Sequence, residues 1–241
     1  MNVPERETRY HARVDPHRRG AALANVILGG QDGLVNVLGV VLGVAAATAS
    51  TPIVLAAGLA STLAGAVSMT AVAYSSRLAE SARYESERAR EYRHVRTVPD
   101  VEREEIRAMY AQKGFEGALL DRIVETITAN EDVWVAVMMS EEHQLAPISR
   151  AAAIQGALIV GVACLCGSLI PLAPFLVLAP RAATWAAVTA AAIALFAVGA
   201  YKARVTVGGP VRSGVEMALI GTASALVAYG AGALMRVPIT P

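Results

Sequence analysis

Long apolar stretches alternate with polar segments along this chain of 241 residues. A helix needs about 20 residues to cross the roughly 30 Å apolar core of a bilayer, and five stretches reach that length. Backbone groups in that core find no water, so each must bond within its own helix. The pattern therefore predicts an all-α membrane protein with five transmembrane helices, over residues 21–48, 53–76, 151–170, 182–201 and about 211–235.

Polar residues fill the two main regions outside these spans. Residues 1–20 form a polar arm without the apolar core of a cleavable signal peptide. Residues 77–150, between the second and third spans, contain fifteen of the twenty Asp and Glu residues. We therefore expect an arm over 1–20, spans one and two over 21–76, an acidic helical insert over 77–150, and spans three to five with a short tail over 151–241.

Prolines indicate how the insert is built. No proline lies between Pro52 and Pro99, so the second span is expected to continue as one helix of roughly 45 residues, about 67 Å long and over twice the bilayer core. A second helix is expected to begin with Asp100 as its cap and to end near Gly114. Two further helices are predicted over residues 116–129 and 131–144.

Composition and charge narrow the class of partner and predict how the chain is oriented in the membrane. Hydrophobic residues make up 55% of the chain, while the net charge of +1 gives no reason to expect nucleic acid as a partner. Eight cations lie in the arm and around the loop between spans four and five, against two on the opposite side. Because cytosolic loops are enriched in Lys and Arg, the N-terminus and residues 77–150 are predicted to be cytosolic. The eight are Arg6, Arg9, Arg13, Arg18, Arg19, Lys202, Arg204 and Arg212, and the two are Arg181 and Arg236.

Potential metal ligands recur at helical spacing in the insert and so share helix faces. They are Glu91 and His94, Glu102 and Glu105, and Met138 and Glu142, with Met139 beside the last pair. Glutamates from three helices can converge on a divalent cation, and methionine or histidine favours Fe²⁺, Mn²⁺, Co²⁺ or Zn²⁺ over Ca²⁺ and Mg²⁺. The alternative is a solvated face in which Arg83, Arg88, Arg90 and Arg93 pair with the glutamates. His143 is a weaker candidate.

Carboxylates inside the predicted spans are functional candidates because they are expensive in hydrocarbon. Asp32 lies in the first span with Asn36 one turn further on, and Glu216 lies in the last span. Asp32 alternatively caps a helix or forms a salt bridge near the interface, and Arg212 can neutralise Glu216. Met69 in the second span is either a soft ligand or a packing residue.

Glycines in the first span predict close helix contacts. Gly29 and Gly33 are four residues apart, as are Gly39 and Gly43. This small-xxx-small spacing lets the backbones of two membrane helices approach each other.

Several segments together resemble the vacuolar iron transporter family, over about residues 21–235 and in the right order. They are Asp32-Gly33-Leu34, Ala64-Gly65-Ala66-Val67-Ser68-Met69, Thr97-Val98-Pro99-Asp100, Trp134 through Met138-Met139, and Ala218-Leu219-Ile220-Gly221. The resemblance implies a homodimer whose spans line a path for exchanging protons with Fe²⁺ or Mn²⁺. It also implies that the cytosolic helices collect metal at the subunit interface.

Residue by residue, the resemblance implies that Asp32 and Met69 are membrane ligands. It implies a cytosolic ligand set of Glu91, Glu102, Glu105, Met138, Met139 and Glu142. His94 stands where the family has glutamate, which makes metal affinity pH-dependent near neutrality. Ser61 stands where the family's transporters often carry a second membrane glutamate. Since serine carries no proton at neutral pH, either Asp32 alone handles metal and proton, or Glu216 supplies the missing carboxylate.

The sequence predicts a proton-coupled transporter that exports or sequesters Fe²⁺ or Mn²⁺ from the cytosol. The alternative is a membrane-anchored metal-binding or sensory protein without transport activity. No nucleophile–base pair or phosphate loop suggests an enzyme, and no prosthetic group is expected; the divalent ions are substrate. Expected partners are a second copy, the bilayer and the metal. Alanine- and arginine-rich usage favours a bacterial plasma membrane, with a vacuolar-type membrane as the alternative.

Overall fold

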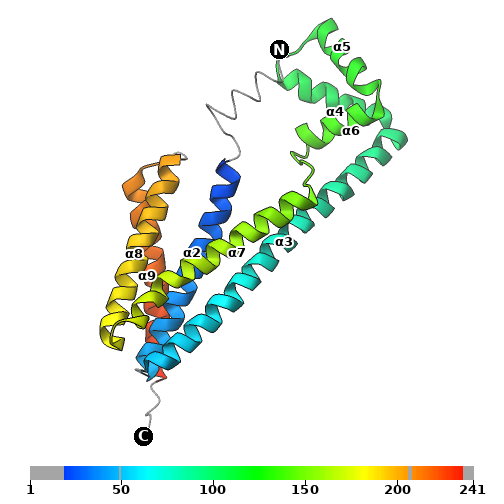
Figure 1. The fold of residues 1–241 in the computed structure, drawn as a ribbon. Coiled ribbons are helices and arrows are strands. Elements are labelled where there is room, and N and C mark those ends of the chain that lie inside the picture. Colours follow the sequence, from blue (N-terminus) through cyan, green and yellow to red (C-terminus); the bar gives the residue numbers. More distant parts are fainter. Residues whose placement is uncertain (1–18, 49, 206–207, 236–241) are drawn as a thin grey trace, which may run out of the picture. The chain divides into compact units, whose positions relative to one another are not determined.

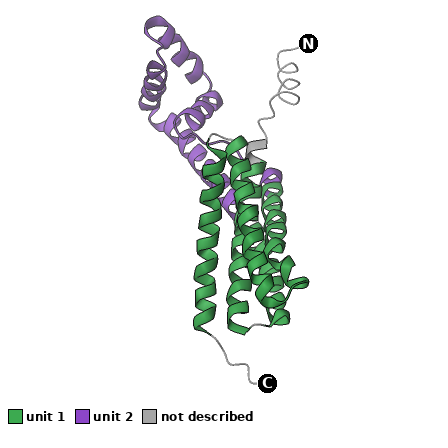
Figure 2. Ribbon diagram, turned by 90° about the vertical axis from the view of Figure 1, so that its left-hand side faces the viewer, with its two compact units in different colours: residues 1–74, 154–241 green, residues 75–153 purple. Residues whose placement is uncertain are grey.

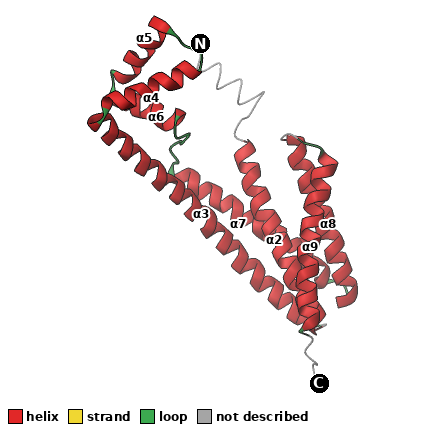
Figure 3. Cartoon of the chain, turned by 180° about the vertical axis from the view of Figure 1, so that it is seen from behind, coloured by secondary structure: helices red, strands yellow, loops and turns green. Residues whose placement is uncertain are grey.

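A computed structural model describes residues 19–48, 50–205 and 208–235. Every regular element in these residues is a helix, with no strand (Figure 3). Five helices are long and apolar enough to cross a membrane, which confirms the predicted all-α membrane class. The elements are α2 (Arg19–Thr48), α3 (Thr51–Thr97), α4 (Pro99–Gln112), α5 (Gly117–Thr128), α6 (Glu131–Glu141), α7 (Arg150–Leu172), η1 (Ala173–Leu176), α8 (Pro180–Val205) and α9 (Pro210–Leu234) (Figure 1).

The chain divides into two compact units (Figure 2). The first, called the bundle below, comprises Met1–Tyr74 and Ile154–Pro241; the second, called the insert domain, is Ser75–Ala153. Within the bundle, α8 packs along α9, and α2 packs against both. Its core is aliphatic, with Leu38, Val41 and Leu195 almost completely buried.

The long helix predicted from the proline spacing is present. α3 runs without a break for 47 residues, which corresponds to about 70 Å at 1.5 Å per residue. The expected cap at Asp100 was wrong: Val98 is the N-cap of α4 and Pro99 occupies the first turn, because a helix loses nothing from the missing N–H of a proline there. Gly114, with φ of +90°, follows the end of α4 as expected. α6 ends at Glu141, three residues before the predicted 144.

Glycines bring α2 close to its neighbours in the bundle. A methyl group at Gly29 would overlap the carbonyl of Val160 on α7, and one at Gly33 would overlap that of Cys164. Gly43 lies close to α9, where a methyl group would come to 3.1 Å from the carbonyl oxygen of Ala228. The contacts predicted from the small-xxx-small spacing are therefore confirmed, and they set two faces of α2 against α7 and α9.

Replacing Gly33 with alanine is expected to destabilise the bundle by about 1–3 kcal/mol. The added methyl group would meet the Cys164 carbonyl and the Ser168 hydroxyl, neither of which is a flexible side-chain end. Thermal unfolding of the detergent-solubilised protein measures the effect. Gly230→Ala is the matched control, because a Cβ there meets nothing within 4 Å. Equal melting temperatures for the two variants would contradict the close packing.

Candidate metal centre

The insert domain is held together by a core that joins all four of its helices. Ile106 from α4, Val124 from α5 and Trp134 from α6 are buried in one cluster with Val95 of α3. Each such buried side chain stabilises the folded state by about 1.5–3 kcal/mol. This core fixes which faces of the helices meet and therefore where their polar side chains converge.

Polar contacts fix the start of α6 against α3. The Tyr92 hydroxyl donates to Asp132 at 2.6 Å, and the Arg96 guanidinium donates to Glu131 at 2.7 Å. Asn130 caps α6 by accepting from the backbone N–H groups of Asp132 and Val133. The predicted ligands lie at the other end of α6. The contacts at its start therefore fix the position of α6 against α3 without using any of those ligands.

Carboxylates and imidazoles from three parts of the chain meet at one place. Nδ1 of His94 lies 3.3 Å from Oε1 of Glu102 and 3.9 Å from Oε1 of Glu91. Nε2 of His143 lies 3.1 Å from the same Glu91 oxygen. Two groups of ligand atoms, Glu91 with His94 and Glu102, and Glu91 with Glu142 and His143, each lie within 4.8 Å of one another. Such oxygen and nitrogen sets suit a divalent transition-metal ion.

Arginines compensate other carboxylates on α3 but not these. Arg77 pairs with Glu80 and Arg90 with Glu87, both at 3.0 Å, so the predicted solvated face exists on part of the helix. By contrast, Glu91 and Glu102 are 4% exposed, and their ion-pair partners among the described residues are histidines alone. One oxygen of each, Oε2, is buried without a hydrogen-bond partner. A buried carboxylate in this state is costly, and a bound cation would remove that cost.

Burial and mutual repulsion raise the pKa values of this cluster. Burial, followed by the charges of Glu105 and Glu91, raises the pKa of Glu102 to about 7, while His94 opposes the shift. Burial also raises the pKa of Glu142; His143 lowers it, and Glu105 again raises it. The predicted ligand Glu105 is exposed, and it acts on both carboxylates through its charge. The metal-free cluster therefore carries more negative charge than its surroundings compensate.

The two methionines of the predicted ligand set lie in the hydrophobic core. Met138 is 0% exposed and Met139 is 2% exposed, both within the cluster around Trp134. Their role as ligands stays a prediction. His143 was underestimated from the sequence, because it follows the end of α6 and belongs to no helical repeat. The available signal was its place directly after Glu142 and the fact that it is one of only four histidines in the chain.

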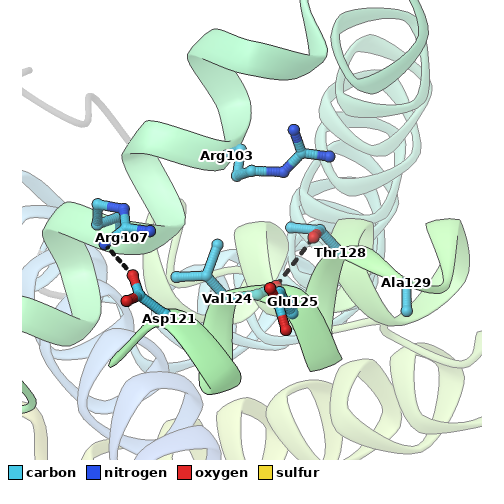
Figure 4. A pocket seen from close by; sticks show the side chains of 7 residues that line it. All are labelled: Arg103, Arg107, Asp121, Val124, Glu125, Thr128 and Ala129. Carbon is cyan, nitrogen blue, oxygen red and sulfur yellow. Dashed lines mark hydrogen bonds and ion pairs between the residues drawn. The ribbon is translucent and has the colours of Figure 1, made fainter. Parts of the chain in front are cut away.

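A separate cleft between α4 and α5 is unsuited to a cation. It encloses about 560 Å³ and is lined by Arg103, Arg107, Asp121, Val124, Glu125, Thr128 and Ala129. Figure 4 shows Arg107 directed at Asp121, with which it pairs at 2.7 Å. Arg103 lies over the ring of Trp134. Two guanidinium groups repel a divalent ion, so the metal candidate in the insert domain is the cluster around Glu91.

In the bundle, contacts between α2 and α3 establish the register of these consecutive helices. A methyl group at Gly58 would touch Val41, and one at Gly65 would lie 4.0 Å from Nδ2 of Asn36. Later positions on α3 thus face earlier positions on α2, as expected for antiparallel neighbours joined by a short connection. The register places the Ala64–Met69 segment opposite the Asp32–Asn36 turn.

One turn beyond Gly65 and Asn36, this register brings Met69 and Asp32 to the same level. Asp32 lies in the middle of α2, away from its ends, and forms no ion pair with another described residue. Asp32 and Asn36 are exposed on one face of the helix, and Met69 is half-buried. The register therefore sets the two predicted membrane ligands at one depth, where the Asp32 carboxylate has no ion pair with another described residue.

Glu216 points away from the packed side of α9. The buried face of that helix consists of Gly214, Met217, Gly221 and Ala225, and Gly221 meets Leu195 and Val35. Glu216 is exposed on the opposite face, without an ion pair to Arg212 within the described part of the chain. The structure thus brings Asp32 and Met69 to one level without directing Glu216 toward them.

Replacing Glu102 with glutamine is expected to raise the melting temperature of the metal-free protein by a few degrees near pH 8. The pKa of Glu102 is about 7 in the folded protein and lower in the unfolded chain. The folded protein therefore loses stability as the pH rises from the unfolded-state pKa to about 7, because the carboxyl group ionises more readily in the unfolded chain. The gain should therefore shrink near pH 5. Glu104→Gln, on the exposed face of α4, is the control; equal gains at both pH values would contradict the assignment.

The chain is similar to known proteins along most of its length. The model of the VIT family matches residues 23–233. Vacuolar iron transporter 1 of Arabidopsis thaliana is 32% identical over 94% of this chain and 91% of its own length. Vacuolar iron transporter 1 of Oryza sativa subsp. japonica is 33% identical, with 92% and 88% covered, and the vacuolar iron transporter of Toxoplasma gondii is 32% identical, with 89% and 74% covered. The chain therefore belongs to the VIT family.

Proposed function

We propose that this protein carries divalent metal ions, Fe²⁺ or Mn²⁺, out of the cytosol in exchange for protons. The observation that supports the proposal is Asp32 in the middle of a membrane helix, without an ion pair to another described residue and level with Met69 by the register of α2 and α3. A carboxylate at that depth is expensive unless it serves an ion or a proton. Its relatives are named vacuolar iron transporters, which supports metal as the cargo.

Asp32 has the properties of a residue that alternates between a metal ion and a proton. An ionised carboxylate binds a dehydrated cation, and the protonated form is the less costly state in hydrocarbon when no cation is present. Met69 adds a soft sulfur ligand at the same level. Ser61 supplies no second acid, and Glu216 faces away from the packed side of its helix. We therefore assign metal and proton handling to Asp32 alone.

A second copy of the chain is the partner that this membrane site requires. Asp32 and Asn36 are exposed on α2 in the single chain. Lipid gives a carboxylate no hydrogen bonds, so this face needs a polar or protein neighbour. In a homodimer, the Asp32 face of α2 in one copy would lie against the same face in the other. The two Asp32 carboxylates would then line a single path for the ion. The insert domain would collect ions on the cytosolic side and raise their local concentration through its carboxylates.

Replacing Asp32 with asparagine is expected to lower metal flux at least about tenfold, because the amide keeps the shape but loses the charge that attracts the ion and carries the proton. Proteoliposomes with an imposed pH gradient, loaded with a metal-sensitive dye, measure this flux. Glu216→Gln is the matched control, since it also removes a membrane carboxylate; its flux and pH dependence should be preserved.

Two outcomes would contradict the proposal. Unchanged flux in Asp32→Asn would remove Asp32 from the path, and loss of flux in Glu216→Gln would assign proton coupling to Glu216. A wild-type chain that binds metal but produces no flux under any gradient would instead identify a membrane-anchored metal-binding or sensory protein.

A further inference from the structure

A groove runs between α3 and α7 in the bundle, along residues 66–74 of α3 and 154–165 of α7, and encloses about 580 Å³. At 1.5 Å per residue its length along α3 is about 12 Å. The two helices touch in it at Gly161, where a methyl group would overlap the Thr70 hydroxyl. We call this feature the α3–α7 groove; both of its walls belong to predicted membrane spans.

The lining of the α3–α7 groove is almost entirely hydrocarbon. Val67, Leu158 and Val162 line it and are exposed, whereas Ala66 and Ala157 line it and are buried. The Thr70 hydroxyl donates to the Ala66 carbonyl, so its proton is already used within α3. Large exposed apolar side chains beside a groove favour an apolar occupant.

Tyr74 gives one end of the groove a polar character. It lines the groove, is half-buried, and forms no hydrogen bond with another described residue. It lies one turn before the first charged residue after the second span, Arg77. Tyrosines are enriched at this depth, where their rings meet hydrocarbon and their hydroxyls meet the head groups. The groove is therefore apolar along its length and offers a hydroxyl donor at the end nearest the interface.

The size of the groove favours a lipid chain over a neighbouring helix. A helix about 10 Å across and 12 Å long occupies roughly 900 Å³, which is more than the groove encloses. An acyl chain is thinner and adapts its torsion angles to irregular walls. A gap between two membrane helices is not left empty, because its walls would lose dispersion contacts. A chain from the surrounding bilayer is thus the occupant that matches both the volume and the lining.

The groove lies on other faces of its two helices than the predicted ion path. Val67 and Ala71 line the groove, and each is two residues from Met69, which places Met69 on the far side of α3. On α7, the backbone of Val160 meets Gly29 of α2, whereas Leu158, two residues earlier, lines the groove. A molecule in the groove would therefore contact α3 and α7 without approaching the level of Asp32.

We propose that the α3–α7 groove binds one glycerophospholipid of the bilayer. One acyl chain lies between α3 and α7, and an ester or phosphate oxygen of the same molecule accepts a hydrogen bond from the Tyr74 hydroxyl. Because both helices also pack against α2, the lipid stabilises the part of the bundle on which α2 rests. The site goes beyond the proposed transport and requires no metal.

Phospholipid binding to the full-length protein in mild detergent tests the inference. Native mass spectrometry follows the titration of delipidated protein with palmitoyl-oleoyl phosphatidylglycerol. The wild type is expected to bind one phospholipid per chain in preference to further copies, and to melt at a higher temperature with it. Ala71→Trp fills the groove from its exposed lining and should weaken this binding at least about tenfold, because several CH₂ groups of the chain lose their burial. Tyr74→Phe should weaken it about three- to tenfold through the loss of one hydrogen bond.

Ala197→Trp is the matched control. It places the same indole on an exposed alanine of α8, outside the groove, and should keep the affinity and the thermal shift of the wild type. It also corrects for phospholipid that attaches to any apolar surface of the bundle.

The inference is overturned if folded Ala71→Trp binds phospholipid as well as Ala197→Trp does. Wild-type affinity in Tyr74→Phe overturns the contact between the head group and Tyr74, and this variant decides the question if Ala71→Trp does not fold. A changed number of chains per particle in Ala71→Trp, with phospholipid binding unaltered, would identify the groove as an interface between copies and would also overturn the inference. The proposed transport is judged separately, by flux through Asp32.

Discussion

The cost of holding carboxylates out of water without a cation is the constraint on which the other features of this chain depend. It acts at Glu91 and Glu102 in the insert domain and at Asp32 in the middle of α2. Arginines are abundant on α3, yet those with ion pairs in the described residues face other carboxylates, such as Glu80 and Glu87. Among the described residues, the buried carboxylates Glu91 and Glu102 have no arginine or lysine partner, and a divalent cation is the simplest partner for them.

A cluster of like charges persists only where the surrounding fold opposes their repulsion. In the insert domain this is the role of the apolar core around Ile106 and Trp134 and of the contact between Tyr92 and Asp132 at the start of α6. These contacts lie outside the metal cluster. They hold the candidate ligands of three segments together, so the proposed metal binding needs little reordering of the chain.

The features that follow from length and periodicity were predictable from the sequence. Span lengths depend on bilayer thickness, and the uninterrupted helix through residues 51–97 follows from the absence of proline after Pro52. The contribution of His143 was not predictable, because it lies beyond the end of α6, where two backbone N–H groups share the Met138 carbonyl. Beyond the end of a helix, helical spacing does not predict where a side chain such as that of His143 points. Nor does the sequence show whether Met138 packs in the hydrophobic core or binds a metal, since a methionine side chain can do either.

The division into two units separates two chemical tasks. Both histidines of the described residues, His94 and His143, belong to the insert domain, whereas the level of Asp32 and Met69 offers oxygen and sulfur. Imidazole ligands that could discriminate between metal ions are thus available in the insert domain, whereas Asp32 and Met69 offer none. In the proposed transport cycle the site at Asp32 and Met69 has to release its ion, and a single carboxylate with a weak thioether suits release better than a polydentate cluster would. The proposed function therefore gives selection of the ion and its passage to different ligands.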